Sequence, residues 1–155
     1  MTSRPLSPAQ ERLWRAIARM MVVLPRAIDE DLIAKTGLSL TSYIVLSQLS
    51  EAPDRQLRMS DLADRSALSP SRMSRVVHSM EDAGLVGRSV SPHDHRASIA
   101  ALTEAGLDRL RQAWPCHLEG VRRLAVDHIR RTEIALVTAV IERIVASVES
   151  RTRGA

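Results

Sequence analysis

The sequence predicts a mainly α-helical protein that carries one small β-hairpin. Three observations support this fold class. Apolar residues recur at spacings of three and four along two long segments, one toward each end of the chain. Two short segments in the middle each begin with a serine and have the length of short helices. Two runs that follow, 85–90 and 98–102, flank a polar turn and read as strands.

The composition fits one globular domain, or a small domain with helical extensions. The chain has 155 residues, of which 45% are hydrophobic and 26% are charged, so it can bury a core without disulfides or a structural metal. A single cysteine excludes an internal disulfide and leaves no cysteine set for zinc. Residues 1–10 lack the apolar segment of a secretory signal, and no apolar run has the length of a membrane span. We therefore expect a cytoplasmic protein with no membrane partner and no cofactor.

The first long segment has both ends of a helix marked in its sequence. Ser7 is a predicted N-cap, Pro8 suits the first helical position, and Gln10 completes a capping box. Gly37 is a predicted C-cap. Pro25 lies inside the apolar pattern and removes one backbone donor, so we expect a kink or a break there.

A second helix is expected to open at Ser39 or Thr41 and to stop before Pro53, because the residue that precedes a proline avoids the helical region. The polar stretch 54–58 is expected to be a connection without regular structure.

The middle of the chain has the pattern of a helix-turn-helix. Ser60 is predicted to cap a helix over 61–66, and Ser69 a second helix over 70–83, with a brief turn between them. Gly84 supplies a left-handed residue after the second helix. Two short helices joined in this way place the second one in a DNA major groove, although any helical hairpin inside a bundle has the same pattern. A β-hairpin directly after them favours a winged helix-turn-helix.

The last part of the chain reads as two helices. Thr103 is predicted to cap a helix that runs to Ala125, with Pro115 as a second expected kink. A break near Arg131 lets Thr132 cap a final helix. Apolar residues on this final helix cover more than one narrow stripe: Ile134, Leu136, Val137, Val140, Ile141, Ile144, Val145 and Val148. Such a helix needs cover, which either a second copy of the chain or the first helix can provide.

The segment from 38 to 106 resembles the MarR (multiple-antibiotic-resistance regulator) family of bacterial transcription factors. The resemblance rests on the spacing of Gly84-Leu85-Val86, Arg88, Pro92, Asp94-x-Arg96, Leu102-Thr103 and Gly106. It implies a homodimer whose terminal helices, 1–37 and 104–155, interlock, and whose winged helix-turn-helix lobes, 38–103, face double-stranded DNA. It also implies a nucleoid-associated regulator, usually a repressor, that binds a pseudo-palindromic operator.

The sequence departs from the family pattern in two places. The wing turn often holds two arginines after the aspartate, whereas here His95 takes the first place and Ala97 follows Arg96. This weakens the expected phosphate contact or makes it titrate near neutral pH. The reactive cysteine near the start of the first helix, which marks the peroxide-sensing branch of the family, is also missing.

The candidate DNA-binding residues fall into two groups. Near the start of the second short helix, where side chains reach base edges, the candidates are Ser69, Ser71, Arg72, Ser74 and Arg75. On the wing, Arg88 is a candidate phosphate contact. The resemblance implies that Arg96 enters the minor groove and that Asp94 holds it by an ion pair. Helix capping, solvated arginines and a surface ion pair are the alternative explanations.

The resemblance further implies a small effector, commonly an aromatic acid or another lipophilic anion, that releases the protein from DNA. Its pocket is expected where the first, second and fifth helices meet the lobe. The candidate lining residues are Arg15, Arg19, Met20, Tyr43 and Met59. Plain core packing explains these residues equally well.

Other classes of function have less support. A formal net charge of +4 permits a polyanionic partner without requiring one, and an aromatic content of 2% disfavours single-stranded nucleic acid. We find no nucleophile elbow, phosphate-binding glycine loop or H-E-x-x-H motif, so no catalytic or metal site is predicted. Two alternatives stay open: a dimeric interaction protein that binds no DNA, and a redox-responsive regulator that uses Cys116, although a lone cysteine on a helix is more often a core residue.

Overall fold

The computed structural model describes residues 4–90 and 98–153. In chain order the elements are α1 (Pro8–Thr36), α2 (Leu40–Ser50), the short 3-10 helix η1 (Pro53–Arg55), β1 (Gln56–Arg58), α3 (Met59–Arg65), α4 (Pro70–Asp82), β2 (Val86–Val90), β3 (Ser98–Leu102), α5 (Glu104–Leu124), the short 3-10 helix η2 (Val126–His128) and α6 (Ile134–Arg153). The predicted mainly helical chain with a small β-wing is confirmed.

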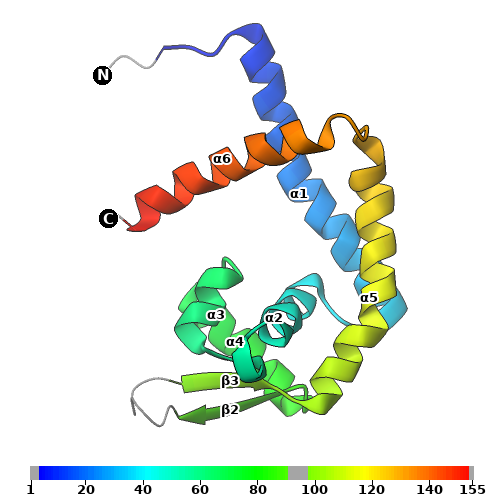
Figure 1. Ribbon diagram of the computed structural model, residues 1–155, viewed down its shortest axis with the longest axis vertical. Helices are drawn as coiled ribbons and strands as arrows, with labels where there is room; N and C mark the ends of the chain where they lie inside the picture. Colours follow the sequence, from blue (N-terminus) through cyan, green and yellow to red (C-terminus); the bar gives the residue numbers. More distant parts are fainter. Residues whose placement is uncertain (1–3, 91–97, 154–155) are drawn as a thin grey trace.

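The elements form a small lobe and a set of long arms (Figure 1). The lobe contains α2, α3, α4 and the sheet. Helices α1 and α5 pack against each other beside it. Helix α6 starts beyond the far end of α5 and runs across the view above the lobe toward the C-terminal end of the chain (Figure 1). None of the described helices is both long and apolar enough to cross a membrane.

The core lies inside the lobe and at the end of α1 nearest to it. Its largest fully buried side chains are Leu32, Val45, Leu46, Leu49, Leu62, Met73, Val77 and Val86. Apolar surface removed from water stabilises by about 25 cal/mol per Å², so this cluster holds α2, α3 and α4 together. By contrast, the first half of α1 leaves large apolar side chains exposed, including Leu13, Met21 and Val22.

The sheet has three antiparallel strands in the order β1-β3-β2. Strands β2 and β3 form the predicted hairpin, in register from Val86 with Leu102 to Val90 with Ser98. The expectation that 54–58 has no regular structure is wrong, because Leu57 in β1 is buried and pairs with Ala100. A strand of three residues is too short to show an alternating pattern in the sequence.

Most predicted helix ends are confirmed by hydrogen bonds. Ser7 forms its capping box with Gln10, and Ser39 rather than Thr41 caps α2. Thr103 accepts from the backbone N–H of Gly106 at 3.0 Å, which caps α5. Gly37 and Gly84 adopt the predicted left-handed conformation.

Two predicted caps are wrong. Helix α3 begins two residues earlier than predicted, at Met59, so Ser60 lies inside it and Arg58 occupies the N-cap position without a side-chain hydrogen bond. Helix α6 begins at Ile134, where the carbonyl of Glu133 accepts from the N–H of Val137 at 2.9 Å. The hydroxyl of Ser60 instead donates to the carboxylate of Asp61 at 3.2 Å.

The two internal prolines do not break their helices. Helix α1 continues through Pro25 and α5 continues through Pro115. A proline inside a helix removes one i→i−4 hydrogen bond and its ring crowds the carbonyl four residues earlier, so each helix continues at a local cost. Packing of α1 against α5 stabilises both helices through these positions.

Candidate nucleic-acid interface

Helix α4 is amphipathic and presents a polar side to solvent. Met73, Val77 and Met80 are buried against the lobe core. On a helix of 3.6 residues per turn, the opposite side carries residues spaced by three and four from Ser71. Ser71 and Arg75 lie there and are exposed. The buried side therefore determines which side chains α4 can offer to a partner.

The predicted residues at the start of α4 have different environments. Ser69 is the N-cap, and its hydroxyl accepts from the backbone N–H of Arg72 at 3.3 Å. The hydroxyls of Ser69 and Ser71 are also 3.3 Å apart. Ser74 is half-buried and lies on the flank of α4 opposite to Arg72. Ser69 thus has a structural role, which leaves Ser71 and the two arginines as the most accessible candidates.

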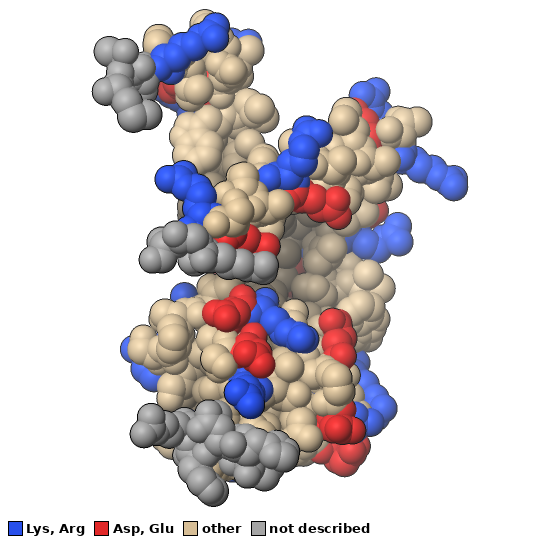
Figure 2. Space-filling view, turned by 60° about the vertical axis from the view of Figure 1, so that its left-hand side comes forward, with Lys and Arg blue, Asp and Glu red and all other residues tan. Residues whose placement is uncertain are grey.

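Arg72 and Arg75 are available for an external partner. Neither guanidinium forms an ion pair or hydrogen bond with any residue in the ranges 4–90 and 98–153. Many other arginines are paired, such as Arg55 with Glu104 and Arg123 with Asp31. On the face drawn in Figure 2, basic and acidic side chains are interspersed. Binding to a polyanion therefore depends on the placement of a few arginines.

Two exposed residues in the next turn of α4 are not among the DNA contacts predicted from the sequence. His78 lies seven residues after Ser71, on the same side of the helix, and its side chain is 71% exposed. Its Nε2 atom is 3.9 Å from Oδ2 of Asp82. Ser79 is also exposed and lies beside Arg75. The spacing from Ser71 and Arg75 is the signal that could have identified His78.

The described part of the wing positions Arg88. Its Nε donates to the hydroxyl of Ser98 at 2.8 Å, across the hairpin. This contact keeps the guanidinium on the strand pair near the wing turn. The predicted contacts Asp94 and Arg96, together with His95, lie outside the described residues.

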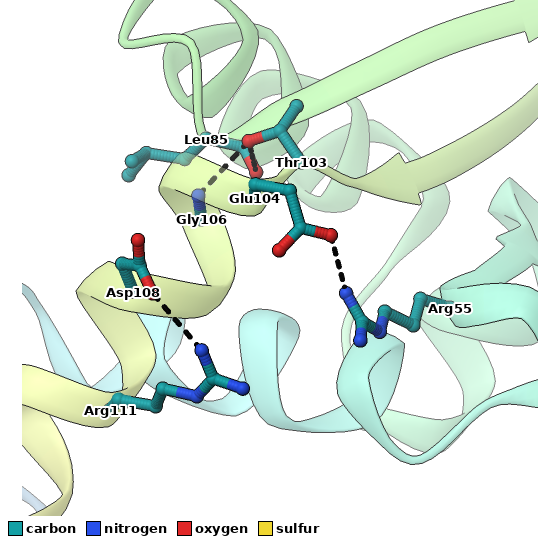
Figure 3. Close-up of polar contacts among 7 residues, drawn as sticks. All are labelled: Arg55, Leu85, Thr103, Glu104, Gly106, Asp108 and Arg111. Carbon is teal, nitrogen blue, oxygen red and sulfur yellow. Dashed lines mark hydrogen bonds and ion pairs between the residues drawn. The ribbon is translucent and has the colours of Figure 1, made fainter.

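The base of the wing is fixed to the start of α5 (Figure 3). The hydroxyl of Thr103 donates its proton between two carbonyls, that of Gly84 at 2.8 Å and that of Leu85 at 3.0 Å. Gly106 packs so closely that an added Cβ would lie 2.8 Å from Cδ1 of Leu102. Arg55, just before β1, donates to Glu104 at 2.8 Å. The wing and the long helix α5 are therefore joined by both backbone and side-chain contacts.

Within the described residues, the five candidate effector residues lie in different environments. Arg19 and Met20 line an apolar groove of about 670 Å³ between α1 and the end of α5, with Ala16, Val23, Leu24, Ala27, Leu124, Ala125, His128 and Ile129. Arg15 instead pairs with Glu11 on the surface of α1. Met59 packs against the lobe core.

Tyr43, the fifth candidate, lies at the junction of α2 and α5 and is only 3% exposed. Its ring stacks on His117, with ring centroids 4.2 Å apart. Neither the Tyr43 hydroxyl nor Nδ1 of His117 has a hydrogen-bond partner within the described structure. Burial, followed by the charge of Glu51, raises the pKa of Tyr43 to about 12, and burial lowers the pKa of His117. Both side chains are therefore neutral at pH 7, and sequence analysis did not single out His117 for this site.

Cys116 has an unremarkable environment. It is half-buried, and its Sγ lies 3.7 Å from the backbone carbonyl of Asp31, to which it donates. This contact helps to pack α5 against α1. Within residues 4–90 and 98–153 no group of three histidine, cysteine or acidic side chains converges to hold a metal ion.

Comparisons with known proteins agree with this architecture. A sequence profile of the MarR family matches residues 36–97. AbsC, a MarR family transcriptional regulator from Streptomyces coelicolor, is 30% identical, with a TM-score of 0.88 over 96% of this chain and 99% of its own. Sco3205, a MarR family transcriptional regulator from the same organism solved in complex with DNA, is 31% identical, with a TM-score of 0.87 over 93% and 90% of the two chains.

Curated relatives are also transcriptional regulators. The HTH-type transcriptional regulator MhqR of Bacillus subtilis is 27% identical over 132 residues, which are 81% of this chain and 89% of that protein. The HTH-type transcriptional repressor Rv2887 of Mycobacterium tuberculosis is 36% identical over 70 residues, which are 45% and 49% of the two chains.

Proposed function

The chain belongs to the MarR family of DNA-binding transcriptional regulators, and from this we propose that it is a homodimeric repressor released from its operator by a small molecule. The observation that carries the proposal is the exposed side of α4, where Arg72 and Arg75 point away from the core without a partner in the described chain. The DNA complex of Sco3205 and the repressor relative Rv2887 support it.

A dimer explains the apolar surface of the arms. Ile134, Leu136 and Ile141 on α6 are exposed in the single chain. Helix α6 runs above the lobe (Figure 1) and does not pack extensively against any other described element, so its apolar residues are available to a second copy. The segments 1–37 and 104–155 then form the dimer, and 38–103 forms the DNA-binding lobe. This arrangement favours cover by a partner over cover by α1 of the same chain.

Two symmetric lobes read two half-sites. For a two-fold dimer with one α4 helix in each major groove, the half-site centres are about 10 base pairs apart or a multiple of that distance. Ser69, Ser71, Ser74 and Arg88 complete the proposed contacts to bases and phosphates. Arg96 enters the minor groove, where a narrow A·T stretch attracts arginine.

The effector is proposed to be a lipophilic anion that binds the groove between α1 and α5. Its lining is apolar apart from Arg19 and His128, and Arg19 supplies a positive charge for a carboxylate or phenolate. Met20 and Leu124 supply the apolar contact.

Selection from random double-stranded DNA, followed by footprinting, tests the proposal. We expect a pseudo-palindrome protected on two half-sites, and release by members of a panel of aromatic acids. A single asymmetric half-site would contradict the dimer, and failure to retain any duplex would favour the DNA-free interaction protein. Loss of peroxide sensitivity in Cys116→Ser would instead favour the redox regulator.

The wing contact has its own test. Arg96→Ala is expected to weaken binding across many sequences and to make the salt dependence of affinity shallower by roughly one unit. Asp94→Ala is expected to reproduce part of this loss, because a free arginine must be ordered when DNA binds. Unchanged affinity and salt dependence for Arg96→Ala would show that the wing does not touch DNA.

A further inference from the structure

The two free arginines of α4 differ in direction. At about 100° per residue, Arg75 lies about 165° around the helix from the mean direction of the buried residues Met73, Val77 and Met80. Arg72 lies only about 105° from that direction. Arg75 therefore points straight out from the lobe, whereas Arg72 leans toward one flank.

The flank toward which Arg72 leans is hollowed. A depression of about 450 Å³ between α2 and α4 is lined by Ser42, Arg72, Arg75, Val76 and Ser79. Its lining has two arginines, two serines whose hydroxyls can donate hydrogen bonds, one valine and no carboxylate. A second hollow, beside β1, also has two arginines, Arg58 and Arg65, but Asp61 lies with them. Of these two hollows, the one between α2 and α4 suits an anion.

The hydroxyl of Ser42 is positioned to donate into this hollow. Ser39 accepts from the backbone N–H of Ser42 at 3.1 Å and donates its own proton to Oγ of Ser42 at 2.9 Å. Ser42 is therefore oriented by a hydrogen bond that it accepts, and its own proton is left for another acceptor. No other acceptor for it occurs in the described ranges of the chain.

One backbone N–H at the start of α2 is already used by another acceptor. The N–H of Leu40 already donates to the carboxylate of Asp29 at 2.7 Å. An anion in the hollow would thus be held by side chains from two helices, with Arg72 supplying the charge and Ser42 a hydrogen bond.

We propose that this hollow binds one phosphate of the DNA backbone, held by Arg72 and Ser42, and that Arg75 is the arginine that reads a base edge. The inference rests on the proposed DNA-binding function and divides its two candidate arginines between two roles. Phosphate contacts set the position and orientation of a protein on DNA, whereas base contacts give specificity. A phosphate held between α2 and α4 would fix the insertion of α4 into the groove relative to the whole lobe.

The test compares variants of the full-length protein on its selected operator, with affinity measured by fluorescence anisotropy over a range of salt concentrations. Arg72→Gln is expected to weaken binding to all sequences by a similar factor, about three- to tenfold, and to make the salt slope shallower by about 0.9. Arg72→Lys is expected to retain the slope, because a phosphate accepts a point charge, whereas bidentate recognition of guanine does not survive this change. Arg75→Ala is expected to relax the preference at one base pair instead.

Ser42 provides an independent arm of the experiment. Ser42→Ala is expected to weaken DNA binding a few-fold, whereas Ser42→Thr, which keeps the hydroxyl, is expected to retain affinity. In a chain that already carries Arg72→Gln, Ser42→Ala is expected to cause no further loss of affinity. A single neutral methylphosphonate at the contacted position is expected to weaken the wild type but not Arg72→Gln. Arg58→Gln is the matched control, because it removes an arginine from the other hollow, and its affinity is expected to stay within twofold of wild type.

Two results would overturn the proposal. One is relaxed preference at a base pair with an unchanged salt slope in Arg72→Gln. The other is a result in which the losses of DNA affinity caused by Ser42→Ala and Arg72→Gln add up in the double variant, and in which Ser42→Thr loses as much affinity as Ser42→Ala although thermal unfolding is unchanged. If the wild type itself retained no duplex, the proposed function would fail instead, so the two failures are distinguishable.

Discussion

Replacing Gly106 by alanine is expected to destabilise the protein, although alanine is normally the better helix residue. Gly106 lies in the first turn of α5, against the base of the wing (Figure 3). A Cβ at this position would lie 2.8 Å from Cδ1 of Leu102 and 3.0 Å from the carbonyl carbon of Leu85, and closer still to its oxygen. Carbon atoms in contact are normally about 3.5–4.0 Å apart, so the carbonyl carbon of Leu85 must move by about 0.5–1 Å, and its oxygen by more.

The size of the effect follows from the contacts that this movement disturbs. Thr103 caps α5 and bonds the carbonyls of Gly84 and Leu85. A lost cap costs about 1 kcal/mol, and forced overpacking costs about 1–3 kcal/mol. Better helix propensity returns at most about 1 kcal/mol. We expect the free energy of unfolding to fall by about 1–3 kcal/mol, which lowers Tm by roughly 2–12 °C in a chain of this size.

The assay is urea and thermal unfolding at one fixed protein concentration, because association of two chains would make Tm depend on concentration. Gly87→Ala is the matched control, since its added Cβ meets nothing within 4 Å. Gly87 is also in the wing, in β2, so the control reports any general effect of alanine there. If Gly106→Ala were as stable as Gly87→Ala, the close approach of α5 to the wing would not constrain the fold.

Three further predictions concern other parts of the chain. Ala67 adopts φ +51° in the turn between α3 and α4, so Ala67→Gly is expected to raise the free energy of unfolding by about 0.5–1 kcal/mol, measured in urea. Leu136→Glu, at a position 66% exposed in the single chain, is expected to shift sedimentation from dimer to monomer, whereas an unchanged dimer would exclude α6 from the interface. Burial lowers the pKa of His117, so the unfolded chain binds more protons than the folded chain just below neutral pH. Stability is therefore expected to fall as pH drops through about 6.5, and His117→Gln is expected to flatten this part of the curve of unfolding free energy against pH.

Much of the fold could be predicted from local sequence signals. Ser7, Ser39, Ser69 and Thr103 mark helix starts because an N-cap hydroxyl satisfies a backbone N–H that has no partner inside the helix. Elements that depend on contacts between segments distant in the sequence could not be predicted in this way. Strand β1 exists because β3 supplies hydrogen-bond partners for Gln56–Arg58, and no residue pattern within three positions reveals a partner more than 40 residues away.

The candidate site shows the same limit. Arg72 and Arg75 could be predicted because they follow a recognisable cap at the start of a helix. Ser42 could not, because only the packing of α2 beside α4 brings it to Arg72. Likewise the sequence predicts Tyr43 in one pocket with Arg19 and Met20, whereas the structure places it against His117, outside the groove that these two residues line.

The contacts between lobe and arms determine how a change in the arms can reach DNA. The carboxylate of Asp29 in α1 accepts from the first N–H of α2, and Arg109 in α5 donates to the carbonyl of Thr36 at the end of α1. At the other side of the lobe, Thr103 and Gly106 join α5 to the wing. The lobe is thus held by the end of α1, by the start of α5, and by the stacking of Tyr43 in α2 on His117 in α5. A ligand or a partner that changes the angle between α1 and α5 is therefore expected to move α4 and the wing together. In the proposed dimer, this movement changes the distance between the two α4 helices rather than the shape of either DNA-binding lobe.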